Sequence, residues 1–274
     1  MGQVKKCYVI AITFILLLFL TVLASANELS KQSALVSILK RGELRVGFEA
    51  GYMPFEMVDK KGNFIGFDID IAREMATAMK VTFVPVNTAW DRIIPALKTG
   101  KIDIIMSGMT ITQQRNLAIN FSDPYFVTGQ TILLNKKHES IVESYRDLNA
   151  SKYTVVSKLA TTGEQAVKQQ IPKCTYKSFE TETEALMQVI SGKADAFVYD
   201  FPSCVVFLAQ HGQDQLLFLD TSFTYEPLAW GIRKGDPDFL NFLNHFLRQI
   251  QNDGRYRQIY RKWMKSNRWL KNVQ

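Results

Sequence analysis

One pattern occurs twice in the sequence, over residues 96–106 and again over residues 188–198, and it constrains the fold more than any other feature. Each copy contains the end of an amphipathic segment, a small hydroxyl residue, Gly-Lys, and an Asp that leads into an apolar strand. The two copies keep one constant offset, so Gly108, beyond the first strand, corresponds to Asp200 at the end of the second. Because strands that alternate with helices form mainly parallel sheets, the repeat predicts two similar α/β lobes.

The first copy ends in a cluster of hydrogen-bond donors. Residues 101–106 are an apolar run without alternation, as expected of a strand buried on both faces, and Ser107 and Gly108 interrupt it. Thr110 and Arg115 follow, at the strand end where open α/β sheets bind ligands. The Arg115 guanidinium can hold a carboxylate through two parallel hydrogen bonds. We interpret the segment as a carboxylate-binding site; the alternative is an ordinary strand-to-helix turn with a solvated arginine.

The second copy ends in a carboxylate, Asp200. Two similar lobes that face each other across a cleft set Arg115 opposite Asp200. A free α-amino acid carries one carboxylate and one ammonium, so it is the ligand that this pair of opposite charges fits. The repeat therefore predicts an amino-acid site between the lobes.

The first 26 residues have the features of a secretory signal peptide. Lys5 and Lys6 precede an apolar run over residues 9–23, which is too short for a membrane span, and Ala24-Ser25-Ala26 is a cleavage site. The alternative is a retained N-terminal anchor. Removal of the two lysines lowers the formal charge from +7 to +5, which does not indicate nucleic-acid binding.

The rest of the chain suffices for two domains of roughly 100 to 150 residues each. Cys174 and Cys204 lie beyond the signal peptide, and in an oxidising compartment they either pair or remain two buried thiols. Asp68 is expected to N-cap a helix over residues 69–80. A helix over residues 255–265 is expected to have a basic face. This face is either solvated or contacts an anionic membrane surface or a membrane partner.

Catalytic and cofactor motifs are absent from the sequence. It contains no G-x-G-x-x-G, Walker A or G-x-S-x-G pattern, and its three histidines have no metal-ligand spacing. No motif therefore indicates an enzyme, a cofactor or a metal site. A catalytic carboxylate within the cleft remains an alternative.

Seven short motifs, in order, cover residues 41–263. Each is weak alone, but their order and spacing are specific. The chain resembles the periplasmic amino-acid-binding proteins of bacterial ABC importers, the family 3 extracellular solute-binding proteins. The motifs are Leu44-Arg45-Val46-Gly47, Met53-Pro54-Phe55-Glu56, Gly66-Phe67-Asp68-Ile69-Asp70, Ile94-Pro95-Ala96-Leu97, Thr110-Ile111-Thr112 with Arg115, Phe121-Ser122-Asp123-Pro124-Tyr125, and Asp253-Gly254-Arg255-Tyr256 with Lys262-Trp263.

This resemblance implies an α/β fold of two Rossmann-like lobes joined by two hinge strands, a type II periplasmic-binding-protein fold with the ligand in the interlobe cleft. Lobe 1 is expected to comprise residues 27–127 and 228–274, and lobe 2 residues 128–227. The resemblance also implies a periplasmic monomer that serves an ABC permease in the inner membrane. A separate subunit would supply the ATPase, and nucleic acid is not an expected partner.

The family also implies a role for individual residues. Arg115, with the backbone of Thr110 and Thr162, would hold the α-carboxylate, and Thr161 and Gly163 would line the lobe 2 side.

Asp200, with Ser107 and the carbonyl near Gly108, would hold the α-ammonium. Tyr52 and Trp90 would sandwich the ligand side chain; the alternatives are a loop tyrosine packed on proline and a core tryptophan.

Glu49 would lie at the far end of the ligand, unless it is a surface carboxylate. If it faces the pocket, its charge favours a basic side chain, and we hypothesise a basic or otherwise polar amino acid as ligand. The chain departs from the family at Ala160, where a glycine is usual.

Two other functions are weighed against the binding protein. One is a periplasmic enzyme on the same scaffold, similar to cyclohexadienyl dehydratases. The other, a sensory domain, is less expected because no signalling segment follows the second lobe in this sequence.

Overall fold

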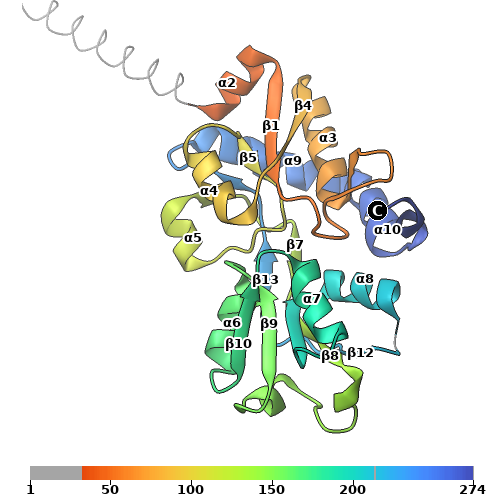
Figure 1. The fold of residues 1–274 in the computed structure, drawn as a ribbon. Coiled ribbons are helices and arrows are strands. Elements are labelled where there is room, and N and C mark those ends of the chain that lie inside the picture. The colour runs from red at the N-terminus through yellow and green to blue at the C-terminus, as the bar shows by residue number, and fades with distance from the viewer. Residues whose placement is uncertain (1–32, 213, 274) are drawn as a thin grey trace, which may run out of the picture.

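The computed structural model describes residues 33–212 and 214–273. The signal peptide expected at residues 1–26 lies outside the described residues. The described chain forms two α/β lobes, each built around a five-stranded sheet, and Figure 1 shows them one above the other. None of the helices in residues 33–212 and 214–273 is long and apolar enough to cross a membrane.

The first lobe contains a sheet of order β4-β1-β5-β14-β6. β1 pairs in parallel with β4 and β5, whereas β14 is antiparallel to β5 and β6. The strands are β1 (Glu43–Phe48), β4 (Thr82–Asn87), β5 (Ile104–Ile105), β6 (Asn120–Phe121) and β14 (Gly231–Ile232), with a hairpin of β2 (Met57–Val58) and β3 (Phe64–Ile65). The helices are α2 (Ala34–Arg41), α3 (Phe67–Met79), α4 (Trp90–Lys98), α5 (Gln113–Ala118), α9 (Pro237–Asn252), α10 (Arg255–Met264) and the 3-10 helix η3 (Arg268–Asn272).

The second lobe contains a sheet of order β10-β9-β11-β8-β12. β9 pairs in parallel with β10 and β11, whereas β8 is antiparallel to β11 and β12. The strands are β8 (Gln130–Asn135), β9 (Thr154–Lys158), β10 (Thr175–Phe179), β11 (Ala196–Asp200) and β12 (Leu216–Leu219). The helices are α6 (Thr162–Gln170), α7 (Glu182–Ile190), α8 (Phe201–His211), η1 (Lys136–His138) and η2 (Tyr145–Leu148).

The two copies of the sequence pattern occupy matching places in the two lobes. The first runs from α4 into β5 and the second from α7 into β11, and each strand is the third in its sheet order. The predicted pair of α/β lobes is therefore confirmed. β5 is shorter than the expected strand, since only Ile104 and Ile105 form ladder pairs.

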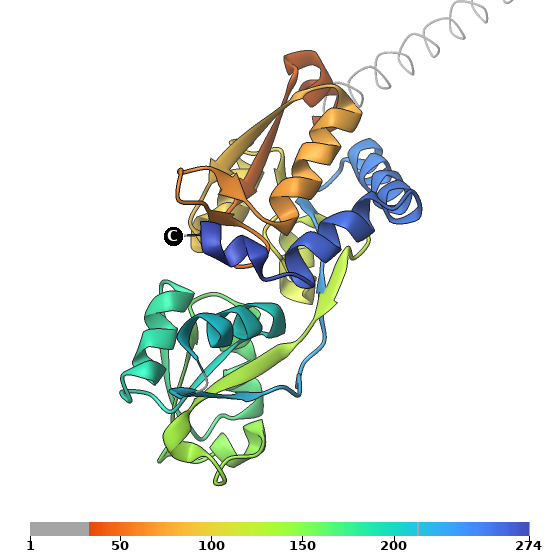
Figure 2. The same ribbon diagram turned by 90° about the vertical axis from the view of Figure 1, so that its right-hand side faces the viewer.

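The chain crosses between the lobes twice, at β7 (Phe126–Thr128) and β13 (Glu226–Leu228). The two strands pair antiparallel, with Thr128 opposite Glu226 and Phe126 opposite Leu228. Figure 2 shows these crossing segments beside each other. The expected lobe boundaries, at residues 127/128 and 227/228, fall within this ladder and stay a prediction.

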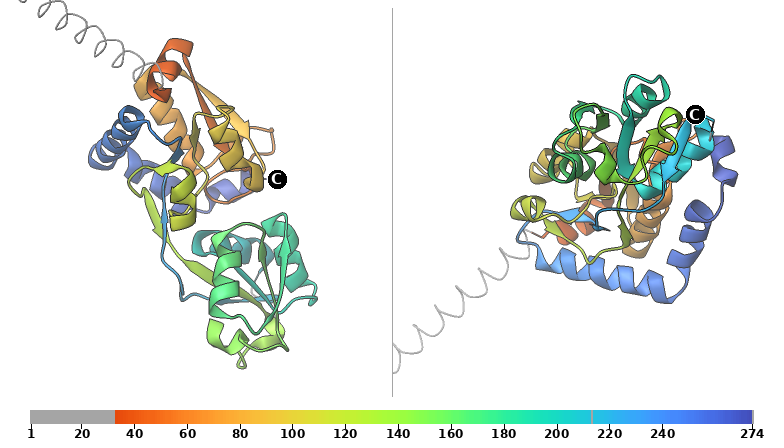
Figure 3. Two further views of the ribbon diagram at one scale, coloured as in Figure 1. Left: turned by 90° about the vertical axis from the view of Figure 1, so that its left-hand side faces the viewer. Right: turned by 90° about the horizontal axis from the view of Figure 1, so that it is seen from below.

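The last helices complete the core of the first lobe and lie along one side of it (Figure 3). Ile259 and Trp263, which are four positions apart on one face of α10, are buried. Part of its basic face pairs with α3, because Lys262 Nζ lies 2.7 Å from the Asp70 carboxylate and Arg255 Nη1 lies 3.1 Å from that of Glu74. These basic side chains are therefore neither wholly solvated nor wholly free for a membrane.

Asp68 does not cap α3, so that expectation was wrong. The helix begins at Phe67 after Gly66, and the Asp68 side chain is turned into the core. Its Oδ2 accepts hydrogen bonds from the Gly108 backbone N–H at 3.0 Å and from the Tyr125 hydroxyl at 2.8 Å. A tertiary contact to the loop that follows β5 thus replaces the local capping bond.

Cys174 and Cys204 are both free thiols. Cys204 is fully buried in the largest apolar cluster, whereas Cys174 packs at the edge of a second cluster in lobe 2. Of the two alternatives left open by the sequence, the structure has the unpaired one.

Candidate functional site

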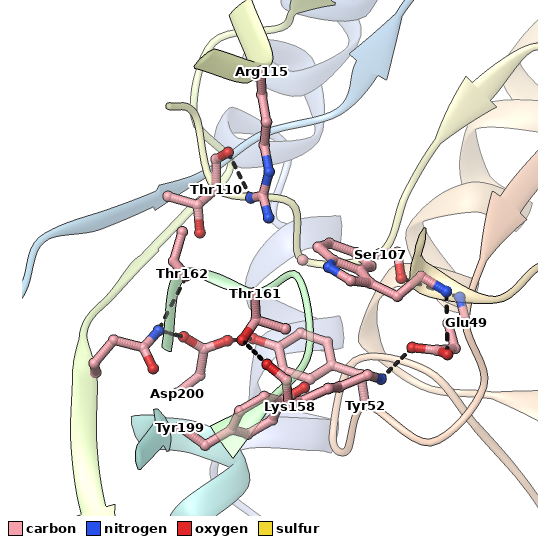
Figure 4. A pocket seen from close by; sticks show the side chains of 13 residues that line it. Glu49, Tyr52, Ser107, Thr110, Arg115, Lys158, Thr161, Thr162, Tyr199 and Asp200 are labelled. Atoms are coloured by element: carbon pink, nitrogen blue, oxygen red, sulfur yellow. Dashed lines mark hydrogen bonds and ion pairs between the residues drawn. The ribbon is translucent and has the colours of Figure 1, made fainter. Parts of the chain in front are cut away.

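A cavity lies between the lobes, at the carboxyl ends of β1, β5, β9 and β11. Figure 4 shows the side chains that line it. The space that atoms leave empty within it is about 390 Å³, part of which is open to solvent. The structure brings together all ten residues predicted from the sequence, which are Glu49, Tyr52, Trp90, Ser107, Gly108, Thr110, Arg115, Thr161, Thr162 and Asp200.

Arg115 is a buried cation held by backbone carbonyls. Thr112 caps α5 by accepting from the Arg115 backbone N–H at 3.1 Å. The Arg115 guanidinium donates to the carbonyls of Thr110 at 3.1 Å and Ala160 at 3.5 Å, and its carbon lies 5.2 Å from the ring centre of Trp90. Burial lowers the pKa of Arg115 to about 10, so it stays protonated at neutral pH. No acidic side chain of residues 33–212 and 214–273 forms an ion pair with it.

The N-terminus of α6 faces Arg115 from the other lobe (Figure 4). Thr161 caps the helix: its hydroxyl accepts from the Glu164 N–H at 3.4 Å and donates to the Lys158 carbonyl at 2.7 Å. The unpaired N–H groups of the first turn, beginning at Thr162, form the positive end of the helix dipole. The Arg115 guanidinium and the N–H groups at the start of α6 together provide positive charge and hydrogen-bond donors for a carboxylate.

Asp200 is the buried anion of the cavity. Its Oδ2 accepts from the Tyr52 hydroxyl at 2.6 Å, and its Oδ1 accepts from the Gln130 amide at 2.6 Å. Burial raises the pKa of Asp200 to about 7, although these two hydrogen bonds and the charge of Arg115 oppose the shift. When ionised, Asp200 is an acceptor suited to an ammonium group.

Gly108 and Ser107 form one wall of the cavity, and carboxylates behind them hold both. The Gly108 N–H donates to Asp68, and the Ser107 hydroxyl donates to the buried Glu56. Gly108 has φ +52°, and a Cβ there would lie 2.1 Å from the Tyr52 ring. Both the backbone conformation and the available space therefore require glycine at this position.

Lys158, at the end of β9, reaches across the cavity to the other lobe. Its Nζ donates to Glu182 Oε2 at 2.8 Å and to Glu49 Oε2, while Glu49 Oε1 accepts from the Trp90 backbone N–H at 3.2 Å. Burial lowers the pKa of Lys158, but the charges and hydrogen bonds of the two carboxylates outweigh it and raise this pKa above its ordinary value. Glu49 therefore faces the pocket with its charge already paired.

The predicted aromatic pair lines the cavity from lobe 1. Tyr52 stacks on Phe55, with ring centres 4.8 Å apart, and its hydroxyl reaches Asp200. The Trp90 indole N–H crosses the cleft and donates to the Ala160 carbonyl at 2.9 Å. Whether these rings sandwich a ligand stays a prediction.

Ala160 has φ +61°, in the left-handed region where glycine is preferred. Its carbonyl accepts from both Trp90 and Arg115, so the strained residue docks lobe 2 onto lobe 1.

A comparison with known protein families gives a match over most of the chain. The model of the bacterial extracellular solute-binding proteins, family 3, matches residues 44–266. The chain belongs to this family.

Relatives within the family include proteins with amino-acid ligands. The chain is similar to a putative ABC-transporter binding component from Wolinella succinogenes complexed with lysine, at 55% identity and a TM-score of 0.82, covering 85% of this chain and all of that one. It is similar to an ancestral amino-acid-binding protein described as a precursor of cyclohexadienyl dehydratase, at 46% identity, a TM-score of 0.80 and the same coverage. A probable histidine-binding protein of Neisseria gonorrhoeae is 33% identical over 80% of this chain and 82% of its own.

Three residues of this family member's cavity were missed by the sequence analysis: Gln130, Lys158 and Tyr199. Lys158 left a detectable signal, because it is a charged residue that ends β9 directly before the loop predicted to line the site, at the same sheet edge as Asp200. Gln130 left none, since it begins β8 and approaches from the crossing segment. Among residues 33–212 and 214–273, no group of three or more His, Cys, Asp or Glu side chains could hold a metal ion.

Proposed function

We propose that this solute-binding protein captures a free polar L-amino acid between its two lobes and delivers it to an ABC permease. One observation carries the proposal: a buried cation, Arg115, and a buried anion, Asp200, line one cavity without bonding each other. A zwitterion satisfies both, with its carboxylate on Arg115 and the end of α6, and its ammonium on Asp200. Buried charges of this kind are costly unless they are paired, so such a ligand stabilises the closed cavity.

We propose a basic side chain as the preferred one. Glu49 lines the pocket together with Tyr52 and Trp90, and aromatic faces attract cations. The similarity to a lysine complex supports this preference.

Transport requires the two lobes to move. The cavity is lined from both lobes, and the paired strands β7 and β13 are the only crossings among the described residues, so bending there opens the site. Contacts made only in the closed form drive closure around the ligand. A monomer of this kind, in the periplasm, presents its closed form to a permease whose ATPase is a separate subunit.

Thermal unfolding of residues 27–274 against each common amino acid tests the proposal. A ligand at about 100 times its Kd stabilises by roughly 2.7 kcal/mol, which raises the melting temperature. Arg115→Ala and Asp200→Ala should abolish the rise, while Arg248→Ala, at an exposed ion pair with Asp123, should preserve it. If no amino acid raises the melting temperature of the unaltered protein, the proposal is wrong.

An enzyme of the cyclohexadienyl dehydratase kind is the rival function. The similarity to a precursor of that enzyme and the raised pKa of Asp200 favour it. An Asp200 paired to a ligand ammonium is not free for acid or base chemistry, so we propose a protein without catalytic activity. Turnover of prephenate or arogenate by the purified protein would establish the enzyme instead.

A further inference from the structure

An ion cluster of two acids and one base lies at one end of the cavity. Lys158 ends β9 and Glu182 begins α7, so both belong to lobe 2, whereas Glu49 follows β1 in lobe 1. Figure 4 shows Glu49 and the tip of Lys158 on the side of the cavity away from Arg115. This is the side where the side chain of an amino acid lies when its carboxylate is on Arg115.

Lys158 forms one ion pair within lobe 2 and one across the cleft. The pair with Glu182 lies within lobe 2 and is deeply buried, with side chains 4% and 6% exposed. The pair with Glu49 crosses the cleft, and the Glu49 side chain is 20% exposed. Opening of the cleft therefore separates Lys158 from Glu49 and leaves it on Glu182.

The cluster carries one uncompensated negative charge, because Lys158 faces both Glu49 and Glu182. Elsewhere in the cavity, Arg115 and an ionised Asp200 have opposite charges, the buried Glu226 adds negative charge near both, and the zwitterionic part of an amino acid is neutral. A buried surplus charge is unfavourable unless a counter-charge reaches it. A ligand side chain with a positive charge offsets the surplus negative charge of this cluster.

We propose that Lys158 is a specificity-determining residue. Without a cationic ligand, the Lys158 ammonium pairs with Glu49; when such a ligand binds, the ligand's own cation replaces Lys158 at Glu49. A cationic ligand takes over Glu49 while Lys158 remains on Glu182. A neutral ligand leaves Lys158 bridging both carboxylates. The inference rests on the proposed amino-acid function and names its substrate class and the residue that sets it.

Two variants shift the affinity for a cationic ligand in opposite directions. In K158M/E182Q the competing ammonium and its buried partner are removed together, so Glu49 is left for the ligand. L-lysine should then bind roughly tenfold more tightly, the effect of one charge-assisted hydrogen bond, and L-glutamine more weakly. In E182Q, Lys158 has only Glu49, so L-lysine should bind at least tenfold more weakly.

Isothermal titration of the mature protein with L-lysine and L-glutamine measures these shifts. The control is K136M/E139Q, which makes the same substitutions at an exposed pair 3.3 Å apart and should change neither affinity. If the double variant fails to fold, as its thermal melting without ligand would show, E182Q alone decides, through its loss of L-lysine with L-glutamine binding retained.

Parallel changes for both ligands, or weaker L-lysine binding by K158M/E182Q, would overturn the inference. An unaltered protein that binds L-glutamine but not L-lysine would overturn it too, while leaving the amino-acid function intact. An unaltered protein that binds no amino acid would instead refute the proposed function.

Discussion

Amino-acid binding by this protein should weaken as the pH falls below about 7, because Asp200 must be ionised to hold the ammonium. Burial raises the pKa of Asp200 to about 7 from its ordinary 3.8, a difference of roughly 4 kcal/mol. At pH 5.5 only about 3% of such a group is ionised, so the apparent Kd should be roughly 30-fold higher than at pH 8. A ligand ammonium lowers the pKa of Asp200, so binding near pH 6.5 should release a proton.

Isothermal titration in two buffers of different ionisation enthalpy measures both the Kd and the number of protons released. Asp200→Asn should bind weakly and without this pH dependence. Asp68→Asn is the matched control, because burial also raises the pKa of Asp68 to about 7, yet this residue lies behind Gly108 and does not line the cavity. An affinity that stays constant from pH 5.5 to 8, with no proton released, would refute the reasoning.

Three further predictions concern stability and strain. Folded Asp68 and Asp200 bind more protons than the unfolded chain between about pH 4 and 7, so the ligand-free protein should lose stability as the pH rises through this window. Urea unfolding at pH 5 and pH 8 measures this change, and a larger free energy of unfolding at pH 8 would contradict the prediction. Gly108 has φ +52°, and Gly108→Ala places a Cβ 2.1 Å from the Tyr52 ring. The variant should therefore lose amino-acid binding and at least about 1 kcal/mol of stability. An affinity that a titration finds unchanged would contradict this. Ala160→Gly relieves a left-handed backbone at φ +61° and should stabilise the protein by up to about 1 kcal/mol in the same unfolding assay, whereas a destabilised variant would show that Ala160 is not strained.

The charged poles of the site could be predicted from the sequence because they follow the repeated pattern. Asp200 ends β11 and Arg115 lies in α5, shortly after β5, so each could be placed near a strand end of its own lobe. Their approach to each other across the cleft depended on the expectation that the two lobes face one another. The two lobes followed from the same repeat.

Other features depended on contacts between distant segments. The prediction that Asp68 caps its helix rested on local preference, but the structure uses its carboxylate for Gly108 and Tyr125. The pairing of Lys158 with Glu49 joins residues more than a hundred positions apart and across the cleft, so no pattern along the chain reports it. For the same reason, the resemblance could suggest a place for Glu49 at the ligand, but not that the Glu49 charge is already paired with Lys158.

Because β7 pairs antiparallel with β13, lobe 2 is a domain inserted into the chain of lobe 1. Val127 and Pro227 lie opposite each other in this ladder, so the intervening segment leaves and re-enters lobe 1 at one place. Exchange of that single stretch of gene for the equivalent stretch of a relative replaces Lys158 and Glu182 together. Glu49 and Arg115 stay on lobe 1, so under the role proposed for Lys158 an exchange at these two neighbouring strands would change the ligand preference.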